Sequence, residues 1–169
     1  MNKLGLAVIS IFLACPLSAL AADNPDMSFY KKAAEGGLAE VELGKLAQEK
    51  SPTSSVKDFG AMMVKDHSAA NRKLQTVASS KDIKLPTSPS VGQMGTKTKL
   101  EVLSGTTFDK SYIKGMVKDH EEDIKEFEQE ASSGQDADAK AYAAATLPTL
   151  KAHLKKIKEI AAAQGVDAS

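Results

Sequence analysis

A repeated pentapeptide constrains the fold of this chain more than any other feature of its sequence. The letters MVKDH occupy residues 63–67 and return at residues 116–120, 53 positions later (120 − 67). Each copy lies near the middle of a stretch with the apolar periodicity of an amphipathic helix. The repeat therefore predicts a helical hairpin that is duplicated and paired with itself. It contains two of the three histidines in the chain, His67 and His120, so we expect any chemistry of the protein to lie there.

Four long helices are predicted, joined by two short connections and one long one. The helical patterns run over roughly residues 27–50, 53–81, 107–133 and 136–163, with Asp26 or Ser28 as the expected N-cap of the first. The connections at residues 51–52 and 132–134 are short enough to make the helices that they join antiparallel. Pro148 lies inside the fourth helix and is expected to kink it rather than end it.

The long connection, residues 82–106, is rich in Pro, Gly, Ser and Thr, and only a turn or two at residues 97–103 is expected to be helical. It is long enough to return the chain along the whole bundle before the third helix starts. The sequence thus predicts an all-α fold, a ferritin-like four-helix bundle with one long crossover between helices two and three.

The first 22 residues have the pattern of a secretory signal peptide. A basic start at Lys3 precedes an apolar run from Leu4 to Leu13, which is too short to span a bilayer, and cleavage is expected after Ala21 or Ala22. Residues 23–169 would then form one exported domain, periplasmic or secreted, without a transmembrane helix. The less favoured alternative is a lipoprotein anchored at Cys15.

Composition excludes several classes of function. Lys plus Arg and Asp plus Glu each total 22, so the chain carries no net charge and has no basic footprint for nucleic acid. Cys15 is the only cysteine, which leaves the mature chain without thiolate metal sites or a thiol nucleophile. The serines and threonines of the long connection have no histidine placed beside them by the sequence, so a nucleophilic hydrolase has no support and no specific enzyme is predicted.

Each predicted helix turns one metal-ligating side chain toward the bundle axis. Successive residues lie about 100° apart around a helix, which places the four residues Glu40, His67, His120 and His153 on the apolar faces of helices one to four. Counted along parallel and antiparallel helices, their heights differ by roughly 7 Å. We therefore expect all four side chains to converge near mid-bundle.

These four residues support two interpretations. Three imidazoles and a carboxylate would bind a single transition metal ion, Zn, Fe, Mn or Cu. Alternatively, they form a buried hydrogen-bonded network that binds no metal and fixes helix register. In that case the protein is a helical module that acts through its surface or as a homo-oligomer.

Six further side chains belong to the metal interpretation. Four polar residues are placed to orient the imidazole rings by hydrogen bonding: Asp66, Asn71, Asp119 and Asp123. Met63 and Met116 each precede a histidine by four residues and share its helix face. Thioethers favour Cu(I), although methionine is more often an adaptable core residue.

Several blocks in order resemble the bacterial exported family called domain of unknown function 4142. They are GLAEVELG at 37–44, VKDHSAAN at 64–71, SG and FD within 104–109, DHE at 119–121, and LP, L and H within 147–153. The resemblance covers essentially the whole mature chain and implies a ferritin-like bundle with no settled activity, for which metal handling or envelope stress protection is a suitable role.

One departure from ferritin-like di-iron proteins is plain in the sequence. Those proteins use Glu-x-x-His on two helices, whereas Val64, Val117 and Leu150 stand three positions before the histidines here. A mononuclear or metal-free site is therefore expected.

Overall fold

The computed structural model describes residues 25–168, and this part of the chain is helical with no β-strand. The helices are α1 (Pro25–Lys50), α2 (Ser54–Ser79), α3 (Val91–Glu101), α4 (Gly105–Ser133) and α5 (Ala137–Ala163). The predicted signal peptide, residues 1–22, lies outside the described residues. Within them, the four long helices start and end within a few residues of the predicted limits.

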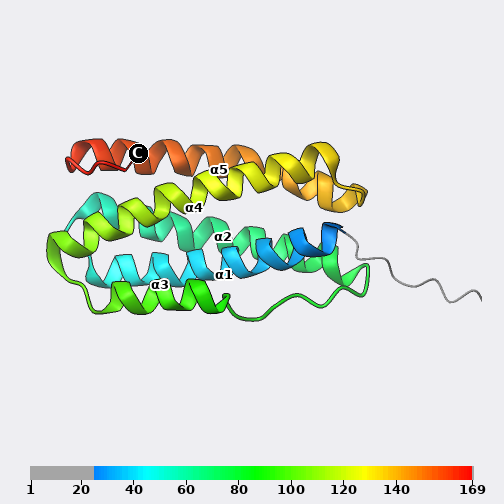
Figure 1. Cartoon of the computed structure of the whole chain (residues 1–169), viewed down its shortest axis with the longest axis horizontal. Helices are drawn as coiled ribbons and strands as arrows, with labels where there is room; N and C mark the ends of the chain where they lie inside the picture. The colour runs from blue at the N-terminus through cyan, green and yellow to red at the C-terminus, as the bar shows by residue number, and fades with distance from the viewer. Residues whose placement is uncertain (1–24, 169) are drawn as a thin grey trace, which may run out of the picture.

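The long helices form an all-helical bundle made of two hairpins. α1 packs mainly against α2, α4 packs mainly against α5, and contacts between α2 and α5 and between α1 and α4 join the hairpins. The connection after α2 runs back along the length of the bundle before α4 begins, so α2 and α4 run in the same direction (Figure 1). A residue in the middle of any long helix is thereby brought to the middle of the bundle.

The main correction to the predicted fold is a fifth helix inside the crossover. α3 spans Val91–Glu101, whereas the sequence predicts only a turn or two near residues 97–103. A capping box starts it, because Ser90 Oγ accepts from the Gln93 backbone N–H while the Gln93 side chain accepts from the Ser90 N–H. This reciprocal capping outweighs the low helix propensity of two glycines in the first turns of α3.

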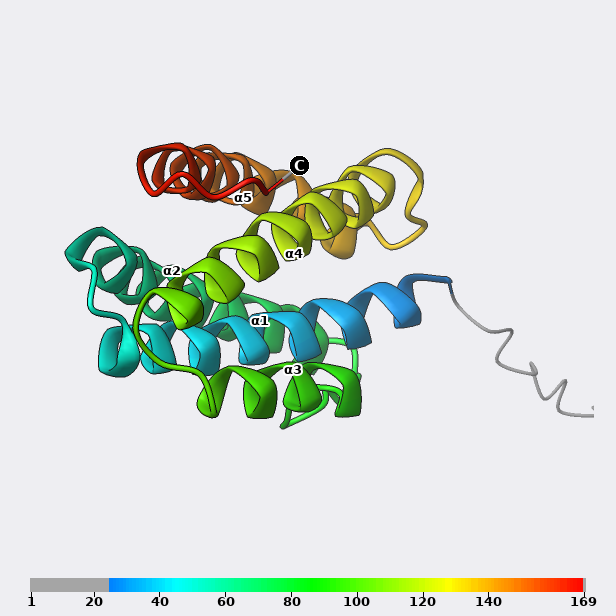
Figure 2. The same cartoon turned by 60° about the vertical axis from the view of Figure 1, so that its left-hand side comes forward.

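α3 lies along the outside of the bundle beside α1 (Figure 2). Leu100 is its buried apolar contact. Lys97 adds charged contacts, with its Nζ 3.3 Å from Glu42 on α1 and 3.3 Å from Glu101 on its own helix. α3 is thus held as a cover over part of α1 and the neighbouring edge of α4.

The predicted N-cap at Asp26 is wrong, and its carboxylate has another role. α1 already begins at Pro25, so Asp26 lies in the first helical turn. Its side chain accepts from the backbone N–H of Gln135, at 3.0 and 3.1 Å, and from that of Asp136. Asp26 therefore ties the start of α1 to the turn between α4 and α5. Pro148 lies inside α5, which continues past it as predicted.

Two apolar clusters fill the bundle and leave a polar layer between them. On α1, one cluster contains Phe29, Tyr30, Ala33 and Ala34, and the other contains Leu43, Leu46 and Ala47. α2, α4 and α5 show the same division: on each helix, one cluster lies before the histidine and the other lies after it. These histidines are His67, His120 and His153. The fold therefore isolates a central layer whose polar side chains are shielded from water above and below.

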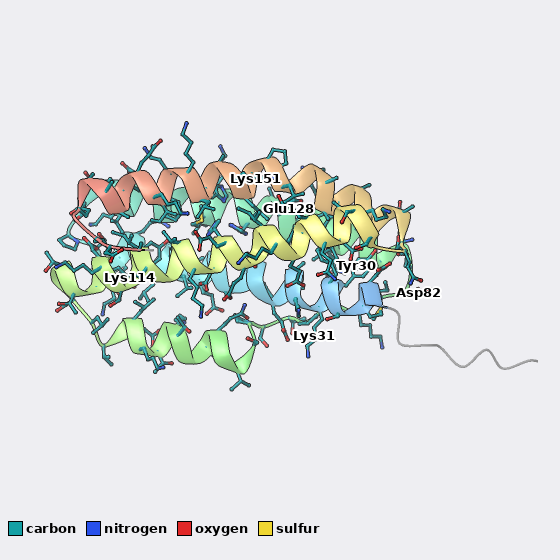
Figure 3. The ribbon with its side chains drawn as sticks, turned by 45° about the horizontal axis from the view of Figure 1, so that its top comes forward. Tyr30, Lys31, Asp82, Lys114, Glu128 and Lys151 are labelled. Atoms are coloured by element: carbon teal, nitrogen blue, oxygen red, sulfur yellow. The ribbon has the colours of Figure 1, made fainter. Side chains whose placement is uncertain are left out.

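The outer faces of the helices are charged. Lys151 on α5 and Glu128 on α4 meet outside the bundle, 2.7 Å apart (Figure 3). Lys158 and Glu121 form a second pair between the same helices at 2.6 Å. Within residues 25–168, no helix is both long enough and apolar enough to cross a bilayer.

Candidate metal centre

The central layer brings together one polar side chain from each long helix. Glu40 comes from α1, His67 from α2, His120 from α4 and His153 from α5, and none is more than 6% exposed. These are the four residues that the sequence turns inward. Burying a carboxylate and three imidazoles is costly unless they compensate one another or bind a cation, so their mutual geometry decides what the layer can do.

Glycines allow α1 and α2 to approach closely enough to bring Glu40 to His67. A Cβ on Gly44 would lie 2.6 Å from the Gly60 carbonyl oxygen, and a Cβ on Gly60 would lie 2.6 Å from that of Gly44. About two turns nearer the start of α1, a Cβ on Gly37 would overlap Asn71 Oδ1. A side chain at Gly44 or Gly60 would meet the facing backbone and push the two helices apart, whereas a side chain at Gly37 would displace that of Asn71.

The three imidazoles are close enough to share one ion. One nitrogen from each of His67, His120 and His153 lies within 4.8 Å of the others. The shortest of the ring contacts joins His120 Nε2 to His153 Nδ1 at 3.4 Å. Glu40 Oε2 lies 3.0 Å from His67 Nε2 and 3.6 Å from His120 Nε2. The carboxylate thus borders the histidine cluster on the α1 side.

Hydrogen bonds on the far side of two rings fix which nitrogens carry protons. His120 Nδ1 lies 2.8 Å from the Met116 carbonyl oxygen, which can only accept, so Nδ1 is the protonated nitrogen. His153 Nε2 lies 3.0 Å from Asp66 Oδ2 and donates to that carboxylate. In the neutral rings, His120 Nε2 and His153 Nδ1 therefore carry lone pairs, and these face each other. Two such acceptors repel unless a cation lies between them.

Glu40 and His67 form a buried ion pair that is close but poorly aligned for hydrogen bonding. Neither Glu40 oxygen nor His67 Nε2 has a hydrogen-bond partner of good geometry among the described residues, despite the 3.0 Å contact. Burial alone would raise the pKa of Glu40, but the neighbouring His120 and His67 side chains outweigh it and lower that pKa. Burial likewise opposes protonation of His67, yet Glu40 raises the pKa of this ring.

His153 is held in the neutral form that metal binding requires. Burial lowers its pKa, and the neighbouring His67 and His120 rings act in the same direction, against the bond to Asp66. The Asp66–His153 contact is the carboxylate–imidazole arrangement that orients rings in many metal sites. Asp66 therefore stands where the sequence predicts an orienting group.

The other predicted supporting residues occupy different positions. Asn71 fills the notch at Gly37 on α1. Asp119 and Asp123 line a pocket between α1, α3 and α4. The thioether side chains of Met63 and Met116 belong to the apolar cluster that contains Phe59 and Tyr112. Their burial in that cluster favours the core role over the ligand role.

An aromatic wall closes the centre on its apolar side. The Phe59 ring lies 6.2 Å from that of His120 and 6.4 Å from that of His153, both in edge-on arrangements. Tyr112 stands behind Phe59, fully buried, with a hydroxyl that has no partner among the described residues. Burial, and then the charge of Glu40, raises the pKa of Tyr112 well above its usual value.

The sequence does not predict the acidic pocket on the opposite side of Glu40. Its volume is about 160 Å³, and its polar lining residues are Glu40, Gln93, Thr96, Asp119, Glu122 and Asp123. Burial, and then Glu40, raises the pKa of Asp119 to about 6 and that of Asp123 well above its usual value. The only sequence signal is the acidic run at residues 119–123 of the chain, which by itself is typical of a solvated helix face.

Fold and site together define an all-helical bundle with a buried histidine cluster. The family profile described as "Domain of unknown function (DUF4142)" matches residues 15–160, and the chain belongs to this family. No curated protein matches the sequence.

Two solved structures share the fold. One, described as a secreted DUF305 protein from Streptomyces coelicolor, superimposes with a TM-score of 0.73 at 14% identity, over 88% of this chain and 99% of that one. The other is CopM in its Cu(I)-bound form, with a TM-score of 0.67 at 13% identity, over 80% of this chain and 94% of that one. At such identities the likeness concerns the fold alone.

Proposed function

We propose that this protein binds one transition metal ion through His67, His120 and His153, with Glu40 as the fourth ligand. The observation that carries the proposal is the pair of lone pairs facing each other 3.4 Å apart, at His120 Nε2 and His153 Nδ1. Both rings are held in this orientation by acceptors on their outer side, the Met116 carbonyl oxygen and the Asp66 carboxylate. A metal ion among these atoms turns their repulsion into coordination, and the Glu40 carboxylate offsets part of its charge.

The donor set favours copper or zinc over iron and manganese. Manganese prefers oxygen ligands; imidazole suits iron as well as zinc and copper, but at nitrogen sites Fe²⁺ generally binds more weakly than Cu²⁺ or Zn²⁺. CopM, whose structure was solved with Cu(I) bound, shares the fold, and this makes copper the first ion to test. Metal handling is the function that such a centre supports, because the cavity that reaches His67 measures only about 20 Å³, room for about one water molecule rather than an organic substrate.

We further propose that the protein is exported and has the ferritin-like bundle topology with one crossover. The N-terminal pattern of residues 1–22 and the description of the Streptomyces relative as secreted support export, which suits a role in envelope metal handling or stress protection. Intact-mass measurement of the protein from its native cell should give a chain that begins at Ala22 or Asp23. A lipid-modified chain beginning at Cys15 would contradict this.

Metal analysis of protein purified without a histidine tag tests the centre directly. We expect about one equivalent of zinc or copper per chain and a higher melting temperature in its presence. His153→Ala should abolish both effects. Tyr112→Phe is the matched control, because it changes a buried group beside Glu40 that is not a proposed ligand. Equal loss of metal in both variants would point to unfolding rather than to loss of a ligand.

One observation favours a second candidate function, a metal-free structural or interaction module. The Glu40–His67 ion pair compensates the buried carboxylate without any metal. In this case the four residues serve stability, and the protein acts through its surface or as an oligomer. Wild-type protein that binds none of Zn, Cu, Fe or Mn, and shows no thermal shift with any of them, would leave only this function.

A further inference from the structure

The buried centre has a polar approach on one side, through the acidic pocket. The pocket lies between α1, α3 and α4, and Glu40 forms part of its wall. Thr96 and Glu122 at its rim are exposed, and the Glu122 side chain is 63% accessible. Glu40 also contacts His67 and His120. This one carboxylate therefore joins the solvent-facing pocket to the histidine cluster.

The chemistry of the pocket suits a hydrated cation. Four of its lining residues carry carboxylates, and no lysine or arginine is among the residues that line it. Both Glu40 oxygens lack a hydrogen-bond partner among the described residues, although the residue is only 3% exposed. Outside the histidine cluster, no three ligand atoms of described residues converge within 4.8 Å. The carboxylates are thus spaced to attract a cation with its water shell rather than to coordinate it directly.

The other opening near the centre is less suitable. A cavity of about 20 Å³ between α1, α2, α4 and α5 reaches His67 and contains a single carboxylate, that of Asp123. Most of its other lining residues are apolar or aromatic, including Phe127, Tyr142 and Leu150. Such a space holds about one water molecule and would strip a metal ion of its water shell at once.

Resting on the proposed metal binding, we propose that the acidic pocket is the path by which a hydrated metal cation reaches the histidines. Asp119 and Asp123 are its positioning residues. They concentrate the hydrated cation beside Glu40. The cation then exchanges its water ligands for protein ligands as it moves inward to the imidazoles. Clefts lined by one sign of charge raise association rates in this way, and the effect weakens with ionic strength.

The rate of Co²⁺ loading tests the path separately from the site. Stopped-flow absorbance would follow Co²⁺ binding to untagged, processed apo protein, at a pH above the raised pKa values of Asp119 and Asp123 so that both are ionised. For the double variant Asp119→Asn/Asp123→Asn we expect the association rate constant at low salt to fall by about tenfold or more, while the equilibrium Kd changes by less than about threefold. The difference should shrink at high salt, where the wild-type advantage is screened.

A second acidic pocket supplies the matched control. It lies near the start of α1 and is lined by Asp26, Glu126 and Glu130 among others. Glu126→Gln removes a charge from the same helix, α4, without touching the proposed path, and should leave the loading rate unchanged. Melting temperatures should show that the double variant is folded, because the substitutions remove like charges that neighbour Glu40.

Each remaining outcome gives a decision. Loading of the double variant at the wild-type rate overturns the path but leaves the metal site standing. A slower rate in Glu126→Gln of the same size reduces the effect to net charge and also overturns it. If the double variant loses affinity only through faster dissociation, Asp119 and Asp123 are ligands rather than positioning residues. Wild-type protein that binds neither Co²⁺ nor Zn²⁺ overturns both the path and the proposed function.

Discussion

The two copies of the pentapeptide MVKDH have the same sequence but different environments. In both copies the methionine and the histidine are buried, and the lysine is exposed: Met63 and Met116 lie in one apolar cluster, while Lys65 and Lys118 face water. This part follows from helix periodicity alone. Identical letters on two amphipathic helices turn the same side chains toward the core.

The aspartate and histidine of each copy have different partners. Asp66 accepts from His153 on α5, whereas Asp119 lines the acidic pocket and has its pKa raised to about 6 by burial and then by Glu40. His120 donates to a backbone carbonyl of its own helix, whereas His67 faces Glu40. The difference teaches that a repeat fixes the direction of a side chain, while the neighbouring helix decides what it meets.

The largest effect is expected from His67→Ala, which would test the special role of the first copy. It leaves the Glu40 carboxylate buried with only the 3.6 Å contact to His120. Breaking a buried ion pair in this way costs about 3–5 kcal/mol, and we expect that loss in urea unfolding of the metal-free protein. Adding Glu40→Gln to this variant should recover part of the loss. No recovery would mean that packing, not charge, is what His67 provides.

The same variant has a pH dependence with a definite sign. Because the folded protein lowers the pKa of Glu40, the stability that this group contributes is present above its unfolded pKa of about 4.3 and is lost as pH falls below it. His67→Ala removes much of the cause of that shift. The stability difference between wild type and variant should therefore narrow as pH falls from about 4.3 toward about 2, the window between the unfolded pKa and the lowered folded pKa of Glu40. A constant difference would show that Glu40 is not the origin of the loss.

His120→Ala comes next and concerns the second copy. The ring is fully buried and fills space beside Phe59, and its removal leaves a cavity and takes the Nδ1–H from the Met116 carbonyl. We expect a cost of about 2–4 kcal/mol in urea unfolding. Glu40→Gln should rescue a smaller share of this loss than of the His67→Ala loss, because the cavity accounts for much of the defect. A neutral result would mean that the ring is not packed in the core.

These contrasts also show how much the sequence could predict. Helix periodicity and the short connections predict the all-helical bundle and the inward direction of Glu40, His67, His120 and His153, which the structure brings together; their role as metal ligands stays a prediction. The sequence predicts too short a helix for α3, because Gly92 and Gly95 have low helix propensity and outweigh the signal of the capping box at Ser90 and Gln93. The acidic pocket was missed because its carboxylates come from two helices, α1 and α4, and meet only after α1 packs against α4.

The next and smaller effect concerns metal affinity. Comparing the Zn²⁺ affinity of Asp66→Asn with that of Asp119→Asn separates the roles of the two aspartates of the repeat. Asp66 orients His153, and losing such a partner typically weakens metal affinity by about 10–100-fold. Asp119→Asn should leave the equilibrium affinity for Zn²⁺ close to that of wild type, since Asp119 lines the acidic pocket beside Glu40 and is not one of the proposed ligands. Competition titration with a zinc indicator measures both values. Equal losses would mean that the two copies act alike after all.

The smallest effect is expected where the copies are most alike, at the two methionines. Met63 and Met116 are buried in the same apolar cluster, so Met63→Leu and Met116→Leu keep volume and should each cost less than about 1.5 kcal/mol. If both serve only as core residues, the ratio of Cu(I) to Zn²⁺ affinity, measured by competition with indicators for each ion, should be unchanged. A loss of Cu(I) affinity with zinc binding intact would instead assign a thioether to the centre, because sulfur favours the softer ion. A loss in one variant alone would then show that the two copies of the repeat differ at the metal itself.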